Sequence, residues 1–219
     1  MRAGPFGYLI SHTSTVARHL GEHLYLVVSA LAIASIFALP LGVLVARARR
    51  VGGIVLQTLN VAYTIPSLAM FAVLVPVFGI GSTTAIAALA VYAQMLLVRN
   101  VALGLLGVPA VLVEAAKGLG MTPWQRFWYV EFPQALPVIL GGLRVATVTL
   151  IALATLGAWV DAGGLGVLIL YGLQHDAPDR TIAGSVVAAA LAVAADRGLR
   201  GIERMAVPSG SRTSASEAP

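Results

Sequence analysis

Long apolar stretches without any charged side chain are the feature that most constrains this chain. Residues 24–46 carry no charge, and neither do residues 51–98. A helix that crosses a bilayer needs about 20 mostly apolar residues, so the first stretch can cross once and the second twice. Only 11% of the residues are charged, against roughly 25% in an average soluble domain. We therefore predict that the chain is surrounded by lipid.

The apolar pattern predicts an all-α integral membrane protein with about five transmembrane helices. These lie near residues 24–46, 54–77, 83–99, 138–160 and 178–196. A glycine-containing turn at residues 78–82 separates the second span from the third. Within the second span, Pro66 predicts a kink. Residues 162–174 are apolar but short, and their glycines predict a re-entrant or interfacial segment, with a sixth crossing as the alternative.

The basic residues divide unequally between the two sides of these spans. Arg2, Arg18 and Arg180 fall on one side, whereas Arg144 lies inside the fourth span, close enough to its end to reach the surface. The other side holds Arg47, Arg49, Arg50, Arg99, Lys117, Arg126, Arg197, Arg200, Arg204 and Arg212. Cytoplasmic loops are enriched in Lys and Arg. We predict a multi-pass protein of the cytoplasmic (inner) membrane, with its N-terminus outside and its C-terminus in the cytoplasm.

The charge pattern and the two terminal segments lead to further predictions about partners and about the ends of the chain. The basic residues lie at the ends of apolar runs, a placement typical of membrane orientation and not of a nucleic-acid partner. Residues 1–22 lack the basic-then-apolar layout of a cleavable signal, so residues 1–23 are expected to be an extracytoplasmic segment. Residues 205–219, rich in Ser, Pro and Ala, predict a disordered cytoplasmic tail.

The longest connection between predicted spans, residues 109–137, has the composition of two short helices. Pro109 can open the first, and residues 110–119 favour a helix. Gly118 and Gly120 can both end it, because glycine is the usual residue after a helix. This loop is therefore expected to be ordered.

The second short helix is predicted at residues 123–130. Thr122 fits the residue before the helix, Pro123 its first position, and Gln125 completes a capping box. Pro133 is expected to stop it. The aromatic residues of this segment are Trp124, Phe127, Trp128 and Tyr129. They can dock a partner, or they can lie among lipid headgroups, where Trp and Tyr are enriched.

Residues 114–133 resemble a known signature. The chain reads Glu-Ala-Ala at residues 114–116, then Gly120 after three residues, then Val-Glu-Phe-Pro at residues 130–133 after nine more. This resembles the EAA motif of the permeases of binding-protein-dependent ABC importers, with Val for Ile and Phe for Leu. The resemblance implies the type I permease (MetI-like) architecture, in which this loop forms the coupling helix that docks on a cytoplasmic ATPase.

Four other stretches narrow the resemblance to the osmoprotectant branch of these permeases, which serve glycine betaine, carnitine and choline. They are residues 63–69, 97–100, 121–125 and 162–166. The likeness covers nearly the whole chain, with residues 24–204 as the permease domain and 109–137 as its EAA loop. Asp161 departs from the pattern, because a small residue is expected before Ala-Gly-Gly-Leu-Gly.

The resemblance also implies site residues and partners. It places Tyr63, Pro66 and Ser67 at the permease core as candidate pathway or gate residues, and we add Asp161, which departs from the pattern, as a fourth candidate. The residues expected to dock on the ATPase are Glu114, Ala115, Ala116, Gly120, Met121, Thr122, Pro123, Trp124 and Pro133. The implied partners are an ABC ATPase dimer carrying ATP and Mg, a second permease subunit, identical or paralogous, and a separate extracytoplasmic substrate-binding protein. No cofactor is expected in this subunit, and it is not itself an enzyme.

Other candidate sites are weaker. The chain has no P-loop, so ATP binding through a Walker motif is excluded. It has no cysteine, so thiolate metal sites and disulfides are impossible. His19 and His23 can share a helix face and bind a metal, but we interpret them as interfacial histidines. The glycines at residues 163–166 follow no strand, which argues against a nucleotide-binding turn.

Three rival functions remain at this point. One is an ABC permease for methionine or another small nutrient. A second is an ion-coupled secondary transporter, which normally places ionisable residues at mid-membrane; only Asp161 approaches that role. A third is a membrane scaffold, which leaves the EAA spacing unexplained.

Overall fold

The structure is a computed structural model that describes residues 4–206. Every regular element within that range is helical, which confirms the predicted all-α class. The elements are α1 (Pro5–Ser11), α2 (Thr13–Arg47), α3 (Arg49–Thr64), α4 (Ser67–Phe78), α5 (Ser82–Leu106), α6 (Ala110–Gly118), α7 (Pro123–Arg126), the π-helical η1 (Phe127–Glu131), α8 (Phe132–Ala154), the 3-10 helical η2 (Thr155–Val160), α9 (Leu165–Gln174) and α10 (Pro178–Ala206).

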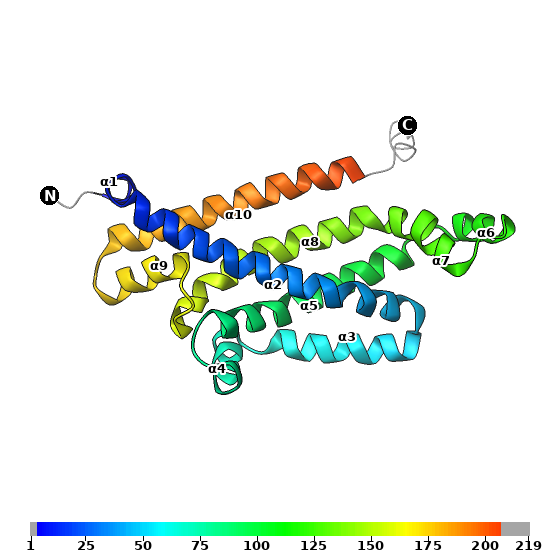
Figure 1. The fold of residues 1–219 in the computed structure, drawn as a ribbon, viewed down its shortest axis with the longest axis horizontal. Coiled ribbons are helices and arrows are strands. Elements are labelled where there is room, and N and C mark those ends of the chain that lie inside the picture. Colours follow the sequence, from blue (N-terminus) through cyan, green and yellow to red (C-terminus); the bar gives the residue numbers. More distant parts are fainter. Residues whose placement is uncertain (1–3, 207–219) are drawn as a thin grey trace, which may run out of the picture.

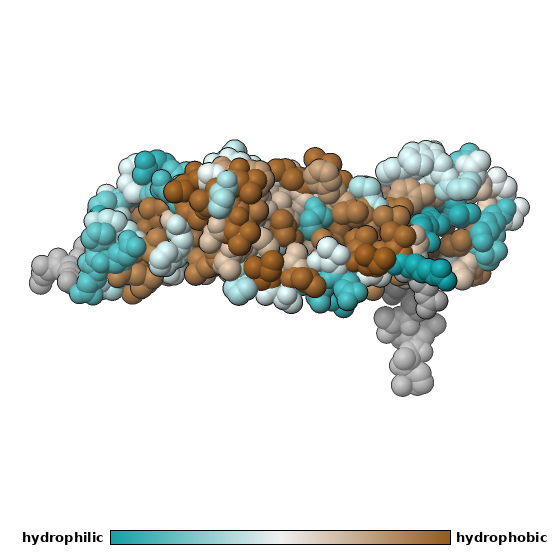
Figure 2. Space-filling view, turned by 90° about the horizontal axis from the view of Figure 1, so that it is seen from below, coloured by the Kyte–Doolittle hydropathy of each residue, from teal (hydrophilic) through white to brown (hydrophobic). Residues whose placement is uncertain are grey.

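The long helices lie side by side along the long axis of the molecule (Figure 1). Helices α6 and α7 form one end, which we call the loop end, and α1 and α9 lie at the opposite end, which we call the α9 end. Figure 2 shows apolar side chains over the middle of the molecule and hydrophilic ones gathered towards the two ends. That distribution fits a bilayer around the middle.

Four segments of the described chain are long and apolar enough to cross a membrane, and the bent pair α3 and α4 makes a fifth possible span. The four are α2, α5, the continuous run Pro123–Val160, and α10. Helix α9 is apolar but has only 10 residues, too few to cross. About five spans are thus confirmed, although the helices extend past most of the predicted boundaries.

The second predicted span is wrong in one respect, because it is broken and not merely kinked. Helices α3 and α4 meet at 100°. Pro66 is responsible, since it has no N–H and holds the residue before it out of the helical region. Ile65 accordingly has an extended backbone, with ψ 129°, and α3 ends at Thr64. The predicted turn at residues 78–82 is confirmed, with φ of 78° at Gly79.

Small residues let the central helices α2, α5 and α8 approach closely. A Cβ atom on Gly42 would lie 2.4 Å from Val101, and one on Gly142 would lie 2.3 Å from Asn100. The fully buried alanines of these helices include Ala30, Ala34, Ala85, Ala88, Ala93, Ala146 and Ala154. Small side chains at helix interfaces are how membrane helices gain close packing without a hydrophobic driving force between them.

Arg144 pairs with two acids of α10, partners that the sequence did not suggest. Its side chain is only 23% exposed, and it forms ion pairs with Asp196 at 2.8 Å and Glu203 at 3.0 Å. Helix α10 continues to Ala206, past the expected end of the fifth span, and so brings Glu203 beside this arginine. The arginine therefore joins α8 to α10.

Candidate functional site

The turn after α6 has the geometry that the sequence predicts. Gly120 has φ +74°, a conformation that favours glycine. The Gly120 N–H donates to the carbonyl of Lys117 at 2.9 Å, and the Met121 N–H donates to the carbonyl of Ala116 at 3.1 Å. This pair of bonds is a Schellman motif, which satisfies the last carbonyls of the helix. Gly118 instead is the last residue of α6.

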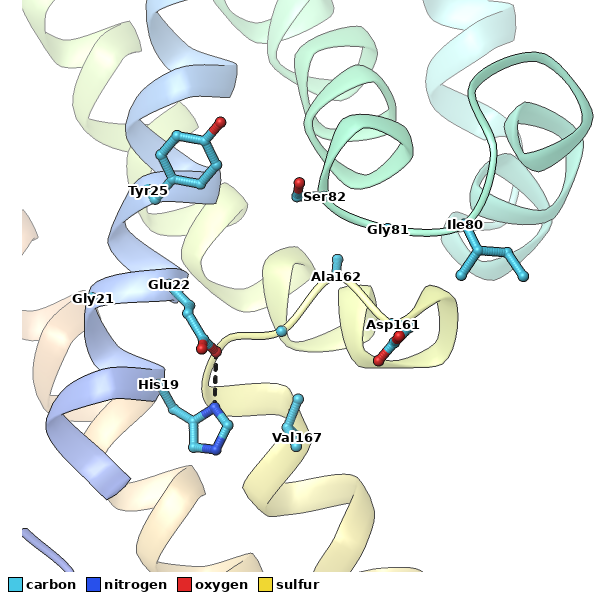
Figure 3. Close-up of a pocket in the computed structure, with 11 residues that line it drawn as sticks. His19, Gly21, Glu22, Tyr25, Ile80, Gly81, Ser82, Asp161, Ala162 and Val167 are labelled. Carbon is cyan, nitrogen blue, oxygen red and sulfur yellow. Dashed lines mark hydrogen bonds and ion pairs between the residues drawn. The ribbon is translucent and has the colours of Figure 1, made fainter. Parts of the chain in front are cut away.

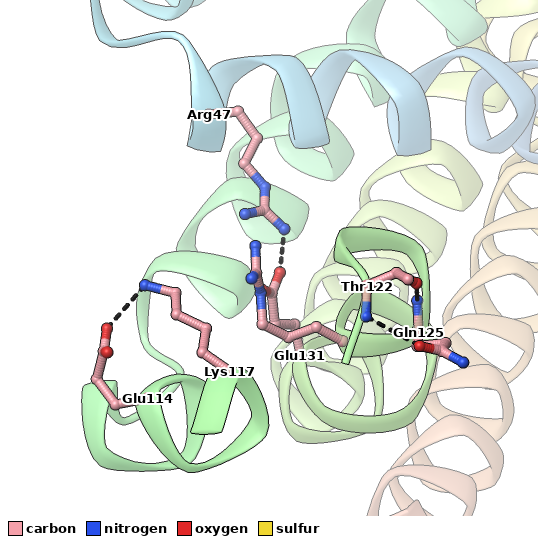
Figure 4. Close-up of polar contacts among 7 residues, drawn as sticks. Arg47, Glu114, Lys117, Thr122, Gln125 and Glu131 are labelled. Atoms are coloured by element: carbon pink, nitrogen blue, oxygen red, sulfur yellow. Dashed lines mark hydrogen bonds and ion pairs between the residues drawn. The ribbon is translucent and has the colours of Figure 1, made fainter. Parts of the chain in front are cut away.

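The capping box at the start of α7 is also confirmed. The Gln125 N–H donates to the Thr122 hydroxyl at 3.3 Å, and the Thr122 N–H donates to the Gln125 side-chain oxygen at 2.9 Å (Figure 4). Pro123 occupies the first turn, where its missing N–H costs nothing. Two local motifs therefore fix the chain between α6 and α7.

Pro133, however, does not stop the second helix. The chain stays helical from Pro123 through η1 into α8. Pro133 lies in the first turn of α8, where a proline is tolerated. The five-residue π-helical segment immediately before it is a rare geometry that is frequently found at functional sites. The fourth span thus grows directly out of the loop.

The EAA-loop residues expected to dock on an ATPase form a largely exposed surface at the loop end. Ala116 is buried and Met121 is partly buried. The exposed members are Glu114, Ala115, Gly120, Thr122, Pro123, Trp124 and Pro133. The aromatic side chains contact one another, with ring centroids 5.6 Å apart for Trp124 and Trp128. Trp124 is nevertheless 71% exposed, a large apolar surface at the end of the molecule.

Glu114 projects from α6 into solvent. Its carboxylate accepts a hydrogen bond from the Lys117 ammonium at 2.8 Å, one turn along the same helix (Figure 4). This bond and the positive charge of Lys117 hold the pKa of Glu114 below its ordinary value. The carboxylate is therefore ionised at neutral pH and accessible to a partner.

Glu131 is a residue of this loop that sequence reasoning missed. Its side chain is only 7% exposed, and its two oxygens bind two different arginines. Oε1 accepts from Nε of Arg126 at 2.8 Å, and Oε2 accepts from the guanidinium of Arg47 in the last turn of α2 (Figure 4). The only signal in the sequence was an acid five residues after Arg126, because Arg47 lies 84 residues away.

Three of the four candidate pathway residues meet at the bend between α3 and α4. Pro66 forms the corner, Ser67 begins α4, and Tyr63 lies in the last turn of α3. The Tyr63 ring packs edge-on against Tyr92 of α5, with centroids 5.8 Å apart. The Tyr92 hydroxyl donates to the carbonyl of Ile65, which ties the break to α5.

The fourth candidate, Asp161, lines a different hollow. This opening of about 790 Å³ lies between the early part of α2, the turn before α5, and the loop between η2 and α9 (Figure 3). Asp161 has φ +54°, unusual for a residue other than glycine. Glu22 of α2 binds the N–H of Gly164 at 2.9 Å and thereby holds this loop. The four candidates thus belong to two places.

The two histidines of α2 have separate partners. Nδ1 of His19 lies 2.9 Å from the Glu22 carboxylate, and Nε2 of His23 donates to the carbonyl of Ile151 at 3.0 Å. Both are buried against neighbouring parts of the chain. Within residues 4–206 no cluster of His, Asp or Glu suited to a metal is present.

Comparison with known proteins places this geometry in a family. Residues 38–204 match the model of the binding-protein-dependent transport system inner membrane component. The chain is 40% identical to the glycine betaine/carnitine/choline transport system permease protein OpuCB of Bacillus subtilis (strain 168), over 87% of this chain and 88% of that protein. It is 38% identical to the osmoprotectant import permease protein OsmW of Salmonella typhimurium (strain LT2), over 94% and 98%.

Solved structures agree. An inward-facing form of the MetNI methionine ABC transporter superposes with a TM-score of 0.80 and 25% identity, over 88% of this chain and 96% of that one. The helical architecture, the family model and two long, close sequence matches lead to one conclusion. The chain belongs to the family of binding-protein-dependent transport system inner membrane components, the permease subunits of ABC importers.

Proposed function

We propose that this chain is the permease subunit of an ATP-driven importer that moves an osmoprotectant quaternary amine, of the glycine betaine, carnitine or choline type, into the cytoplasm. The observation that carries the substrate class is the 38–40% identity, over most of both chains, to permeases with osmoprotectant names. The methionine transporter shares the fold but only 25% identity. A quaternary amine is therefore favoured over methionine.

The loop end is proposed to dock on a cytoplasmic ABC ATPase dimer, which carries the ATP and Mg. The support is physical. The surface is exposed, it bears an ionised carboxylate at Glu114 and a large apolar side chain at Trp124, and two capping motifs order the chain behind it. An ordered surface loses little conformational entropy on binding. A second permease and a separate extracytoplasmic receptor complete the proposed assembly.

Alternating access then needs the two ends of the molecule to move in concert. A pathway can open only if ATP-dependent motion at the loop end biases one of two arrangements of the spans. We assign the bend at Tyr63, Pro66 and Ser67, and the hollow beside Asp161, as the parts of the pathway that change. Both lie at breaks between helices, where a few residues can absorb the change.

The proposed orientation places the loop end in the cytoplasm and the N-terminus outside. The wild-type chain has no cysteine, so single substitutions give a clean background. Lys117→Cys and Arg204→Cys should react with an impermeant thiol reagent only from the cytoplasmic side, and Gly81→Cys only from outside. Labelling of Lys117→Cys from outside would reverse the proposed orientation in the membrane.

Reconstitution tests the function itself. In proteoliposomes holding both permeases, the ATPase and the receptor, uptake of radiolabelled glycine betaine, carnitine or choline should require ATP and survive collapse of the proton and sodium gradients. Methionine serves as the competing substrate. Uptake driven by a gradient without ATP would favour a secondary transporter, and uptake of methionine alone would move the chain to the rival substrate class.

A further inference from the structure

Helix α2 is anchored at both of its ends. At the α9 end, Glu22 binds the N–H of Gly164, and His23 binds the carbonyl of Ile151. At the loop end, Arg47 in its last turn binds Glu131. Glu22 and Arg47 are 25 positions apart on α2, which is about 38 Å at 1.5 Å per residue. One helix thus connects the loop end with the hollow beside Asp161.

The connection at the loop end depends on one carboxylate. Glu131 is the last residue of η1, which connects α7 to α8, and each of its oxygens binds an arginine from a different element. Removing one member of such a pair leaves the other charge without its partner in a place of low dielectric. Glu131 therefore orients the end of α2 relative to α7.

An open, mostly apolar groove lies beside this ion pair. The groove, of about 770 Å³, lies between α2 and the α7–η1 segment and is lined by Leu39, Pro40, Val43, Arg47, Pro123, Trp124 and Phe127. Most of these side chains are apolar, and Arg47 lies at their border. Side chains that meet across an open groove can slide past one another, whereas the ion pair keeps α2 linked to η1.

We propose that Glu131 is a positioning residue for transport, the joint through which movement of the coupling loop is passed to α2 and hence to the α9 end. This rests on the proposed function. Without the joint, the ATPase still docks and hydrolyses ATP, but α2 no longer follows α7. The expected defect is loss of coupling, which differs from loss of folding or of ATPase binding.

The test uses the complete transporter in proteoliposomes, with Glu131→Gln and Arg47→Gln in this chain. Arg47→Gln retains the Arg126 partner of Glu131, so it leaves the buried charge paired. Arg50→Gln, an exposed arginine beyond the end of α2, is the matched control. We expect uptake to fall at least ten-fold in both test variants while ATP hydrolysis per complex stays within two-fold, and the double variant to be no worse than Glu131→Gln.

Other results overturn the proposal. They are uptake and hydrolysis that fall in the same proportion, uptake that stays at the wild-type level, or an equal loss of coupling in Arg50→Gln. If Glu131→Gln does not accumulate, Arg47→Gln decides by the same criteria.

A second measurement is independent of transport. Spin labels on Leu44→Cys and Tyr129→Cys, both exposed positions, report the separation of α2 and η1 in the isolated chain in detergent. We expect a narrow distribution of the distance between the two labels when Arg47 and Arg50 are both present, a broader one in Arg47→Gln, and no broadening in Arg50→Gln. An unchanged distribution in Arg47→Gln would show that the ion pair does not hold α2 to η1, and would overturn the proposal. If the wild-type complex shows no ATP-dependent uptake, the proposed function fails, and this measurement still decides whether Glu131 joins α7 to α2.

Discussion

The two ends of α2 are held by different kinds of contact. At the α9 end, side chains of α2 bind backbone groups, namely the N–H of Gly164 and the carbonyl of Ile151. At the loop end, Arg47 binds the side chain of Glu131. His23 is fully buried, whereas the side chain of Arg47 is 46% exposed. The His23 contact is interior, whereas Arg47 borders an open groove and Glu22, 36% exposed, borders the hollow beside Asp161.

This difference separates a fixed anchor from an adjustable one. A contact to the backbone has one partner that moves only with the chain, and a buried hydrogen bond is costly to leave unmade. Two long side chains can rotate while they stay paired. Substitutions that change packing should therefore have large effects at the α9 end. At the loop end, substitutions that change charge or the direction of the backbone should have the larger effects.

The largest expected effect is at the fixed anchor. Gly164 has φ +81°, and a Cβ atom there would lie 3.1 Å from Nδ1 of His23. Gly79 has φ +78° but open space around it, which makes it the matched control. Gly79→Val should lower the free energy of unfolding by about 1–3 kcal/mol, because φ 78° with ψ −178° is a backbone conformation that essentially only glycine adopts. Gly164→Val should add about 1–3 kcal/mol for overpacking.

Thermal unfolding of the two purified variants in detergent measures this difference. Equal losses in Gly164→Val and Gly79→Val would show that the contact with His23 adds nothing. The α9 end would then be no more tightly held than an ordinary turn, and the contrast between the two ends of α2 would fail.

The second effect belongs to the loop end. Gly120→Val should strain the Schellman turn by about 1–2 kcal/mol and turn α6 away from α7. We expect uptake to fall at least ten-fold and co-purification of the ATPase to weaken, while the spans stay folded. Gly118→Val is the control, since Gly118 is helical with open space beside it.

Three readouts decide this second prediction, namely expression, ATPase co-purification and uptake. Full binding and full uptake in Gly120→Val would mean that the loop is not the coupling element. Failure of Gly120→Val to accumulate in the membrane would mean that Gly120 matters only for folding.

Local chemistry explains what the sequence could predict. The capping box at Thr122 and Gln125 and the turn at Gly120 involve neighbours within a few residues, so residue types alone indicate them. Long uncharged runs likewise indicate the spans without any tertiary information. The EAA spacing, a local pattern, pointed to the family that the comparisons confirm.

Distant partners explain what it could not predict. Glu131 meets Arg47 across 84 residues, and Arg144 meets Asp196 across 52, and no local pattern specifies such pairs. The break at Pro66 was anticipated as a kink, but its 100° angle depends on how α4 packs. Pro133 was misread because a proline that usually ends a helix is also tolerated in the first turn of the next one.

A third prediction sharpens the comparison at Glu22. Glu22→Gln keeps an oxygen that can accept from the N–H of Gly164 but loses the charge that faces His19 and Arg18. We expect the free energy of unfolding to fall by about 1 kcal/mol or less. Glu22→Ala, which removes the acceptor, should cost more. Thermal unfolding of both variants measures this, and equal losses would show that the backbone bond to Gly164 contributes nothing.

The smallest effect is expected at Glu114, whose only described partner is exposed. Lys117 lowers the pKa of Glu114 in the folded chain, so the pair contributes stability above the ordinary carboxyl pKa, and this contribution is lost as the pH falls through the lowered value. No pH dependence from this pair is therefore expected near neutrality. Because solvent screens the pair, Glu114→Ala should not measurably change thermal unfolding at neutral pH.

Its effect should lie in binding alone. Removing one exposed carboxylate deletes a single contact to the ATPase, so Glu114→Ala should weaken ATPase co-purification only a few-fold and reduce uptake less than Gly120→Val does. Lys117→Ala is the control, since it leaves the carboxylate in place and frees it from its intrahelical partner. If Glu114→Ala abolishes uptake while Lys117→Ala does not, the carboxylate itself is essential. The orientation of α6 relative to α7 would then matter less than the charge of the loop. Glu114→Ala, not Gly120→Val, would be the more damaging substitution at the loop end.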